Sequence, residues 1–170
     1  MPPAITSVED VLTEFGPMLA RTAASYERDP ALQQDLLQDI SVALWRALPR
    51  WRGDAPIKGY VARIAHNCGA DHVGGHARRV EAELDESLID PGSGPSEHAQ
   101  THQSRQSLLE AVRQLPLGQR QVVVLSLEGF TLVEIAQALM IEADSATQRM
   151  SRARRALRHY MSQDHEATRP

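Results

Sequence analysis

Four side chains that could bind a metal ion lie close together in the middle of the chain: His66, Cys68, His72 and His76. His72 and His76 are four residues apart, which on a helix places both imidazoles on one face, where they could chelate an ion such as zinc. Cys68, however, falls on the apolar stripe expected of the same helix, and histidine pairs on helices are often incidental. The sequence therefore predicts no metal site and no cofactor.

Motifs for bond chemistry are not found elsewhere in the sequence. It contains no nucleophile elbow, no glycine-rich phosphate loop and no metallohydrolase motif. Asp35 and Asp39 share a helix face, but contact with a protein partner accounts for them better than acid–base catalysis. We expect a binding protein and not an enzyme.

Arginines gather near the C-terminus and could bind a polyanion. Five of them lie between Asp144 and Tyr160, against a single acidic residue. Side chains near the start of such a helix can reach base edges, and arginines further along suit phosphates. The helix would bury Ala146, Met150, Ala153 and Leu157 and direct Ser145, Gln148, Arg149, Arg152 and Arg155 outward. The competing interpretation is a solvated arginine-rich face on an ordinary helical hairpin.

The net charge of −4 conceals a strong segregation of charge along the chain. Six acidic residues and no lysine or arginine lie between Glu81 and Glu97. This segment contains the sequence DPGSGPSE (90–97), whose composition is typical of a flexible linker. We therefore expect an acidic linker over residues 80–102, which could also mask basic surfaces of the free protein.

The remaining composition favours a cytoplasmic, all-α protein. Apolar residues make up 42% of the chain but aromatic residues only 4%, so the core must consist of aliphatic side chains and methionine. No apolar run is long enough to cross a bilayer, which predicts no membrane insertion. Cys68 is the single cysteine, which excludes an internal disulfide and suits a reducing compartment.

Capping residues and apolar periodicity predict where the helices begin and end. Ser7 caps a first helix that Gly16-Pro17 should kink or restart, and Asp29-Pro30 begins a second one that ends near Pro49. A third helix begins near Pro56, with a stripe of Ile57, Val61, Ile64 and Cys68. After the linker, further helices are expected up to Leu115, from about Gly118 to Leu127, from Thr131 to Leu139 and across the arginine-rich segment. The prediction is two small helical domains, 7–79 and 103–162.

The last two helices form a predicted helix-turn-helix. Thr131 and Glu134 make a capping box before a short helix, and Met140-Ile141-Glu142 connects it to the basic helix. The segment LPLGQRQVVVLSLEGFTLVEIAQALMIEADSATQRMSRARRALR (115–158) resembles region 4 of bacterial sigma factors, which reads the −35 promoter element. The resemblance assigns to −35 recognition Thr131, Ser145, Thr147, Gln148, Arg149, Arg152 and Arg155.

The turn departs from the family at two positions. The family usually has glycine where Met140 stands and serine or a similar cap where Glu142 stands. A non-glycine residue at a position of positive φ costs roughly 1 kcal/mol. Glu142 and Asp144 favour the helix dipole but repel phosphates. These changes affect the expected mode of DNA reading more than the fold.

The N-terminal half resembles region 2 of the same family, over DLLQDISVALWRALPRWRGDAPIKGYVARIAHNCGADHVGGHARR (35–79). The resemblance implies that one face of the second helix packs on the clamp coiled coil of the polymerase's largest subunit. This face carries acidic, amide and apolar side chains, namely Asp35, Gln38, Asp39, Val42 and Trp45. The alternative for it is a plain solvated surface.

The segment 49–67 matches the part of region 2 that melts and reads the −10 element. A flipped base needs a polar pocket, unstacked bases need an aromatic surface, and the backbone needs positive charge. Asn67 could read a base, and Tyr60 or Trp51 could stack, although Trp51 could equally be a core residue. The full set assigned to −10 recognition is Arg50, Trp51, Arg52, Lys58, Tyr60, Arg63, Asn67, Asp71, His72, Arg78 and Arg79.

The family usually continues this helix with arginine or lysine, whereas this chain has Gly74-Gly75-His76. Glycine in a helix interior costs roughly 1 kcal/mol, so the sequence predicts that the helix frays there and that promoter opening is weakened. Overall, the chain resembles the small, extracytoplasmic-function (group IV) sigma factors of the sigma-70 family. This implies as partners the clamp and flap of core RNA polymerase and promoter DNA. Such proteins are often held inactive by an anti-sigma factor, and the sequence leaves open whether this chain has one. The alternative is a free-standing helix-turn-helix transcription regulator.

Overall fold

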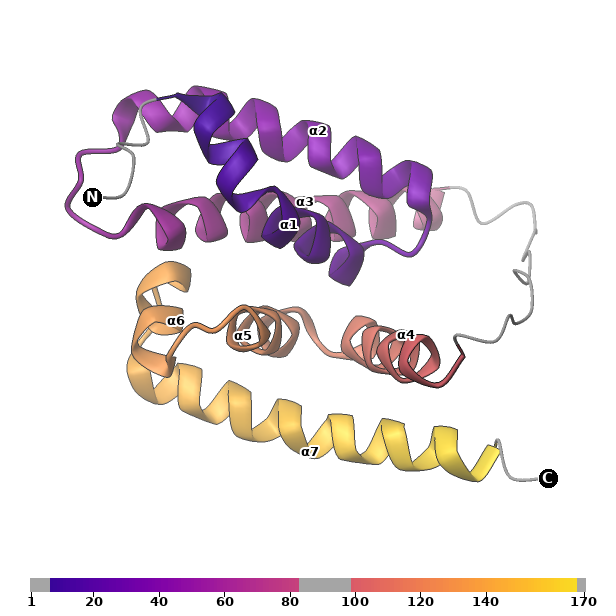
Figure 1. Cartoon of the computed structure of the whole chain (residues 1–170). Helices are drawn as coiled ribbons and strands as arrows, with labels where there is room; N and C mark the ends of the chain where they lie inside the picture. The colour runs from indigo at the N-terminus through magenta and orange to yellow at the C-terminus, as the bar shows by residue number, and fades with distance from the viewer. Residues whose placement is uncertain (1–6, 83–98, 168–170) are drawn as a thin grey trace.

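The computed structural model describes residues 7–82 and 99–167, and each regular element in these two ranges is helical. Figure 1 shows two layers, with the helices before the acidic segment on one side and those after it on the other. The elements are α1 (Val8–Tyr26), α2 (Pro30–Ala47), the 3₁₀ helix η1 (Leu48–Arg50), α3 (Ile57–Ala82), α4 (Ala99–Gln114), α5 (Leu117–Leu127), α6 (Leu132–Leu139) and α7 (Ala143–Ala167). The predicted all-α class, with one helical unit on each side of the acidic segment, is confirmed.

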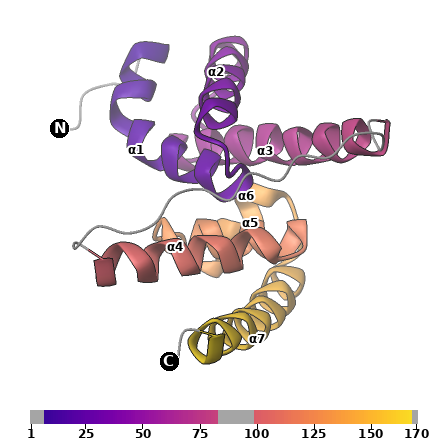
Figure 2. The same ribbon diagram turned by 90° about the vertical axis from the view of Figure 1, so that its right-hand side faces the viewer.

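The predicted caps position the first two helices. The Ser7 hydroxyl accepts a hydrogen bond from the amide of Asp10, whose carboxylate accepts one from the amide of Ser7. Asp29 caps α2, and Pro30 occupies its first position. α1 runs uninterrupted through Pro17, and Figure 2 shows that its axis changes direction along its length. The proline therefore bends the helix but does not restart it.

α3 differs from the prediction in two respects. Its buried face comprises Val61, Ala62, Ala65, His66 and Gly69, whereas Ile57, Ile64 and Cys68 of the predicted stripe are only half-buried. The helix also continues through Gly74-Gly75 to Ala82, so the predicted fraying is wrong. Helix propagation adds one hydrogen bond for each residue fixed, and the turns on both sides of the glycines outweigh their low propensity.

The linker prediction falls mostly outside the described residues. Its first residues, 80–82, belong to α3, and its last residues, 99–102, belong to α4. The acidic residues from 83 to 97, and with them the hypothesis that the linker masks basic surfaces, lie outside the described ranges.

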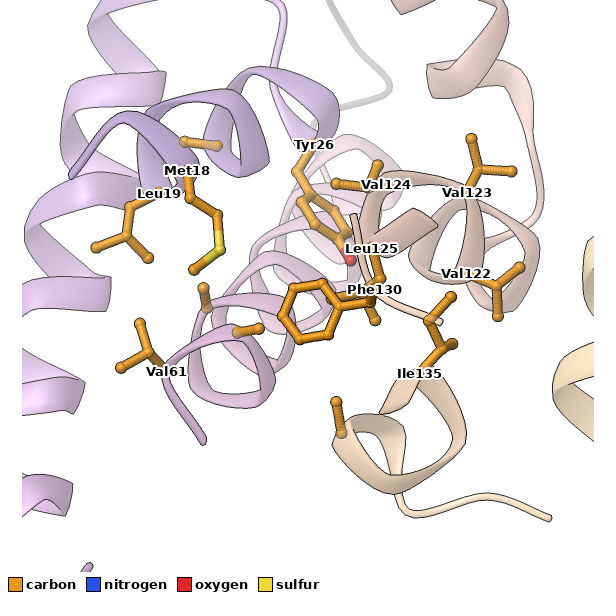
Figure 3. Packing of buried hydrophobic residues seen from close by; sticks show 14 of the residues in the cluster. Met18, Leu19, Tyr26, Val61, Val122, Val123, Val124, Leu125, Phe130 and Ile135 are labelled. Carbon is orange, nitrogen blue, oxygen red and sulfur yellow. The ribbon is translucent and has the colours of Figure 1, made fainter. Parts of the chain in front are cut away.

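The two helical units pack against each other through a continuous hydrophobic core. Met18, Leu19 and Tyr26 of α1 and Val61 of α3 belong to the same buried cluster as Val124 and Leu125 of α5, Phe130 and Ile135. Figure 3 shows Tyr26 and Phe130 between the helices of the two units. The units are therefore joined by apolar packing as well as by the chain.

Polar contacts reinforce this packing at both ends of the interface. The guanidinium of Arg21 makes a bidentate ion pair with Glu128, with distances of 2.7 and 2.8 Å. Lys58 Nζ donates to the backbone carbonyl of Glu128 at 2.9 Å. At the other end, Arg28 pairs with Glu110, and Arg113 donates to the carbonyls of Ala24 and Glu27.

Candidate functional site

The outer face of α2 carries all five side chains predicted to contact a protein partner. Leu36, Ile40 and Leu44 are buried on the opposite face. Val42 is 47% exposed and Trp45 is 67% exposed, which is unusual for such apolar side chains. The polar members Asp35, Gln38 and Asp39 are exposed beside them. The structure therefore brings the whole predicted set together on one accessible surface.

The start of α3 brings together three predicted DNA-binding side chains. The Tyr60 hydroxyl donates to the carbonyl of Ala47 at 2.9 Å, which ties α3 to the end of α2. The guanidinium of Arg63 lies 5.2 Å from the centre of the Tyr60 ring, a cation–π contact. Lys58 precedes Tyr60 by two residues and lines the same cleft as Tyr60 and Arg63. A cation beside an aromatic ring is the combination that an unstacked base and its phosphate require.

The loop before α3 is closed by the Trp51 indole. This side chain is half-buried, and its Nε1 donates to the carbonyl of Ala55 at 3.1 Å. Gly53 supplies the positive φ, 78°, that the loop needs. Arg50 and Arg52 are exposed on either side of Trp51. The indole thus has a structural role in the loop and still keeps part of its surface accessible.

Further along α3, the predicted residues separate into two groups. Asn67 and Asp71 are exposed, whereas the His72 imidazole is half-buried and lies 2.7 Å from the Glu27 carboxylate. Burial would raise the pKa of Glu27, but hydrogen bonds from His72 and from backbone amides lower it overall. His72 is therefore engaged within the protein.

The end of α3 carries the last residues predicted to bind the −10 element, and also the two histidines that could have formed a metal site. Arg78 Nε donates to the carbonyl of Gly74, and the side chain of Arg79 lies outside the described residues. The rings of His72 and His76 stack, with centroids 6.5 Å apart. Within residues 7–82 and 99–167, no group of three or more His, Cys, Asp or Glu side chains could hold a metal ion.

α6 and α7 form the predicted helix-turn-helix. The Thr131 hydroxyl accepts from the amide of Glu134, and the Glu134 carboxylate accepts from the amide and hydroxyl of Thr131. These hydrogen bonds lower the pKa of Glu134. The turn places Met140 in the left-handed region, at φ 55° and ψ 45°, so the glycine-favouring conformation expected at this position is confirmed. Thr131 therefore serves as a helix cap.

Only part of the basic face of α7 is exposed to solvent. Thr147, Gln148, Arg152 and Arg155 are exposed, whereas Ser145 and Arg149 are half-buried. The Arg149 guanidinium lies over Gly118, so close that a β-carbon there would be 3.1 Å from one of its nitrogens. The expectation that Arg149 points fully outward is therefore wrong, because its side chain packs on the start of α5.

Two contacts between distant side chains have no signal in the sequence. Arg21 and Glu128 are 107 residues apart, and no motif links them. The His66 imidazole is buried and hydrogen-bonded to the Tyr26 hydroxyl, although nothing in the sequence distinguishes it from the other histidines.

Among the described helices, none has the length and apolar character to cross a membrane.

Comparison with known proteins relates both halves of the chain to one family. Residues 11–79 match the family model for sigma-70 region 2, and residues 105–157 match the model for sigma-70 region 4. The chain is 28% identical to the RNA polymerase sigma factor CarQ of Myxococcus xanthus, over 91% of this chain and 89% of that protein. It is also 28% identical to the ECF RNA polymerase sigma-E factor of Escherichia coli K12, over 72% of this chain and 70% of that protein.

Some relatives are longer or more distant. A probable RNA polymerase sigma factor, RfaY of Xanthomonas campestris, is 26% identical over 83% of this chain, which spans 37% of that protein's length. Among solved structures, the sigma factor RpoE of Bartonella quintana, in complex with the anti-sigma factor NepR, has a TM-score of 0.75 at 20% identity. It covers 91% of this chain and 96% of that one. The chain therefore belongs to the sigma-70 family, as an alternative sigma factor of the extracytoplasmic-function type.

Proposed function

We propose that the chain binds core RNA polymerase through the outer face of α2 and directs it to promoters through α3 and α7. The observation that carries this proposal is the exposure of Val42 and Trp45 on a helix whose other face is fully packed. Exposed apolar groups flanked by Asp35 and Asp39 suit a protein partner with basic and apolar groups. In this family that partner is the clamp coiled coil of the largest subunit.

The N-terminal unit, residues 7–79, would open and read the −10 element. Lys58, Tyr60 and Arg63 combine positive charge with an aromatic ring at the start of α3, and Arg50 and Arg52 extend the basic surface. The amide of Asn67 is exposed, and we expect it to read a flipped base. His72 contributes less than the sequence suggests, because its imidazole already pairs with Glu27.

The C-terminal unit, residues 103–162, would read the −35 element through the start of α7. Gln148 is the exposed side chain best placed for base edges, while Arg152 and Arg155 suit phosphates. Glu142 is exposed and negatively charged just before α7, and it would reduce the affinity for DNA without changing the docking geometry.

The protein would act by binding alone, in the cytoplasm, while the polymerase carries out RNA synthesis. Solved relatives are complexes with the anti-sigma factor NepR and with the cytosolic domain of CnrY. A regulatory protein partner of this kind is therefore part of the proposal. It would control how often this chain reaches the polymerase.

Gel filtration of the chain mixed with bacterial core RNA polymerase tests the proposal. Wild-type protein should co-elute with the polymerase, and Asp35→Arg/Asp39→Arg should abolish co-elution because it reverses the charge beside Val42 and Trp45. Glu9→Arg/Glu14→Arg is the matched control, since both residues are exposed on α1 and the charge change is the same. Co-elution should survive in this control.

Other outcomes would redirect the assignment. If the wild type fails to bind polymerase but binds DNA tightly by itself, the chain is a free-standing helix-turn-helix regulator. If the α2 variant binds polymerase as well as the wild type does, the docking face has been misplaced.

A further inference from the structure

An open cavity of about 410 Å³ lies where the end of α1 meets the second half of α3, the end of α4 and the start of α5. Its volume is within the range of small-molecule sites in proteins, roughly 300–1,000 Å³. Of the described side chains assigned above to polymerase or DNA, only His72 lines this cavity. It is therefore separate from the surfaces that carry the proposed function.

Three arginines line the cavity at increasing depth. The side chain of Arg28 is 74% exposed, that of Arg113 is 14% exposed, and Arg120 is buried. The lining contains two carboxylates, those of Glu27 and Glu110. Three guanidiniums against two carboxylates leave an excess of one positive charge, and the two histidines of the lining add to it when they are protonated.

The carboxylates of the cavity leave Arg120 without an ionic partner. Glu110 pairs with Arg28 and Arg113. Glu27 accepts hydrogen bonds from an imidazole and from two backbone amides. Within residues 7–82 and 99–167, Arg120 donates to two backbone carbonyls but pairs with no carboxylate, and its buried Nε has no acceptor. A buried donor without an acceptor costs free energy, which an oxygen supplied by a ligand would recover.

The guanidinium of Arg113 also lies close enough to those of Arg28 and Arg120 to repel both. Burial lowers the pKa of Arg113, and the neighbouring Arg28 lowers it further. Burial lowers the pKa of Arg120 as well, and there the neighbouring charge is Arg113. Positive charges that are crowded together in a partly buried space favour the binding of an anion.

The rest of the lining suits an organic body attached to that anion. Val73 and Ala77 contribute apolar surface, and the rings of His72 and His76 stack with centroids 6.5 Å apart. Guanidinium forks match the geometry of phosphate oxygens, and three of them suit a dianion better than a single carboxylate. A phosphate ion alone would fill only a small part of the cavity.

We infer that this cavity binds a small organic phosphate, of about the size of a mononucleotide, whose phosphate group is held by Arg28, Arg113 and Arg120. Such a ligand would contact both helical units, since α1 and α3 form one side of the cavity and α4 and α5 the other. Its binding requires neither polymerase nor promoter DNA.

Isothermal titration calorimetry of the full-length chain with AMP tests the inference. AMP should bind with one-to-one stoichiometry, inorganic phosphate more weakly, and adenosine, which lacks the phosphate, not measurably. Arg28→Gln should weaken AMP binding by about tenfold, the scale of one lost hydrogen bond between charged groups. Arg154→Gln is the matched control, since Arg154 is exposed on α7 and the charge change is the same. It should leave the affinity unchanged.

Glu110→Gln gives a change of the opposite sign. The Glu110 carboxylate occupies donors of both Arg28 and Arg113, so that a phosphate must compete with it. Its removal should tighten AMP binding several-fold, which a purely structural role of Glu110 does not predict. Glu14→Gln, with the same charge change at an exposed position of α1, should have no effect.

Arg120→Lys tests the deepest part of the cavity, because it keeps the positive charge and removes the Nε donor. It should weaken AMP binding, and thermal unfolding without ligand shows whether this variant is folded. Should it not fold, the variants at Arg28 and Glu110 still decide the question.

Three results would overturn the inference. The first is the absence of saturable AMP binding to the wild type, and the second is equal affinity for AMP and adenosine, since the phosphate would then not be recognised. The third is AMP binding that Arg28→Gln and Glu110→Gln both leave unchanged, which would place the ligand on another basic surface. If inorganic phosphate binds as tightly as AMP, the organic part of the ligand is refuted. None of these results depends on whether the chain binds polymerase.

Discussion

The hydroxyl of Tyr26 lies 2.6 Å from Nδ1 of His66, and both side chains are buried between α1 and α3. Burial lowers the pKa of His66 to about 4. The imidazole is thus neutral in the folded protein at neutral pH, and the hydrogen bond to Tyr26 satisfies one of its nitrogens.

This burial makes the free energy of unfolding depend on pH. Below the unfolded-state pKa of about 6.5, the unfolded chain takes up a proton on His66 that the folded chain does not. The contribution of the neutral His66 to the free energy of unfolding is therefore complete above this pH, and it decreases as the pH falls toward 4. At ~1.36 kcal/mol per pH unit, the loss from this residue approaches about 2 kcal/mol at pH 5. Urea unfolding at pH 7.5 and 5 should show this loss reduced in His66→Gln and retained in His159→Gln, which changes an exposed histidine. Equal losses in both variants would contradict the assignment.

A second prediction concerns the close contact of α1 with α3. A β-carbon on Gly69 would lie 2.5 Å from two ring carbons of Tyr26, so Gly69→Ala should force the helices apart and destabilise the protein by about 1–3 kcal/mol. Gly75 has open space around it in the same helix. There the same substitution should stabilise by about 0.5–1 kcal/mol. Denaturant unfolding of the two variants measures both changes in the free energy of unfolding. A Gly69→Ala protein as stable as the wild type would contradict the close contact between Gly69 and Tyr26.

Met140 gives a third prediction, because it occupies a left-handed conformation that glycine adopts without strain. Met140→Gly should stabilise the protein by about 1 kcal/mol, and the side chain loses little packing since it is 76% exposed. Gln137→Gly, at an exposed position inside α6, should instead destabilise by about 1 kcal/mol. Thermal unfolding distinguishes the two; a destabilised Met140→Gly protein would show that the methionine makes a needed contact.

The glycine pair in α3 supports a fourth prediction, on promoter opening. The helix continues through Gly74-Gly75; a β-carbon on Gly75 would meet open space, and one on Gly74 would make only ordinary contact, at 3.8 Å, with the Arg78 side chain. Gly74→Arg/Gly75→Arg should therefore keep the fold and add two cations to the end of α3. Permanganate reactivity of unpaired thymines, with polymerase present, should increase several-fold as phosphate contacts are gained. Glu14→Arg adds the same charge on α1 and should have no effect. Unchanged opening in the α3 variant would argue against a phosphate-binding role for this segment.

Local features of the fold were predictable from the sequence because they depend on neighbouring residues. The caps at Ser7, Asp29 and Thr131 each form within three residues, and each is present as expected. The exposed face of α2 also followed from helical periodicity. For α3, the periodicity of apolar residues was misleading, because the helix buries alanines and His66 in place of Ile57 and Ile64.

Contacts between the two units could not be predicted in this way. The ion pair of Arg21 with Glu128 depends on how the units dock, and exposed arginines and glutamates are common throughout the sequence. The same docking determines the surroundings of Arg113. Its guanidinium is turned inward to the carbonyls of Ala24 and Glu27.

Arg113 lies in the C-terminal unit but donates its hydrogen bonds to backbone carbonyls of the N-terminal unit. The carbonyls at the end of α1 have their donor in α4, and the ring of Tyr26 has a cation, Arg120, above it from α5. Two separately expressed fragments, divided within the acidic segment, should therefore find each other and associate without a covalent connection. In such fragment complementation, each fragment would supply the contacts that the other one needs.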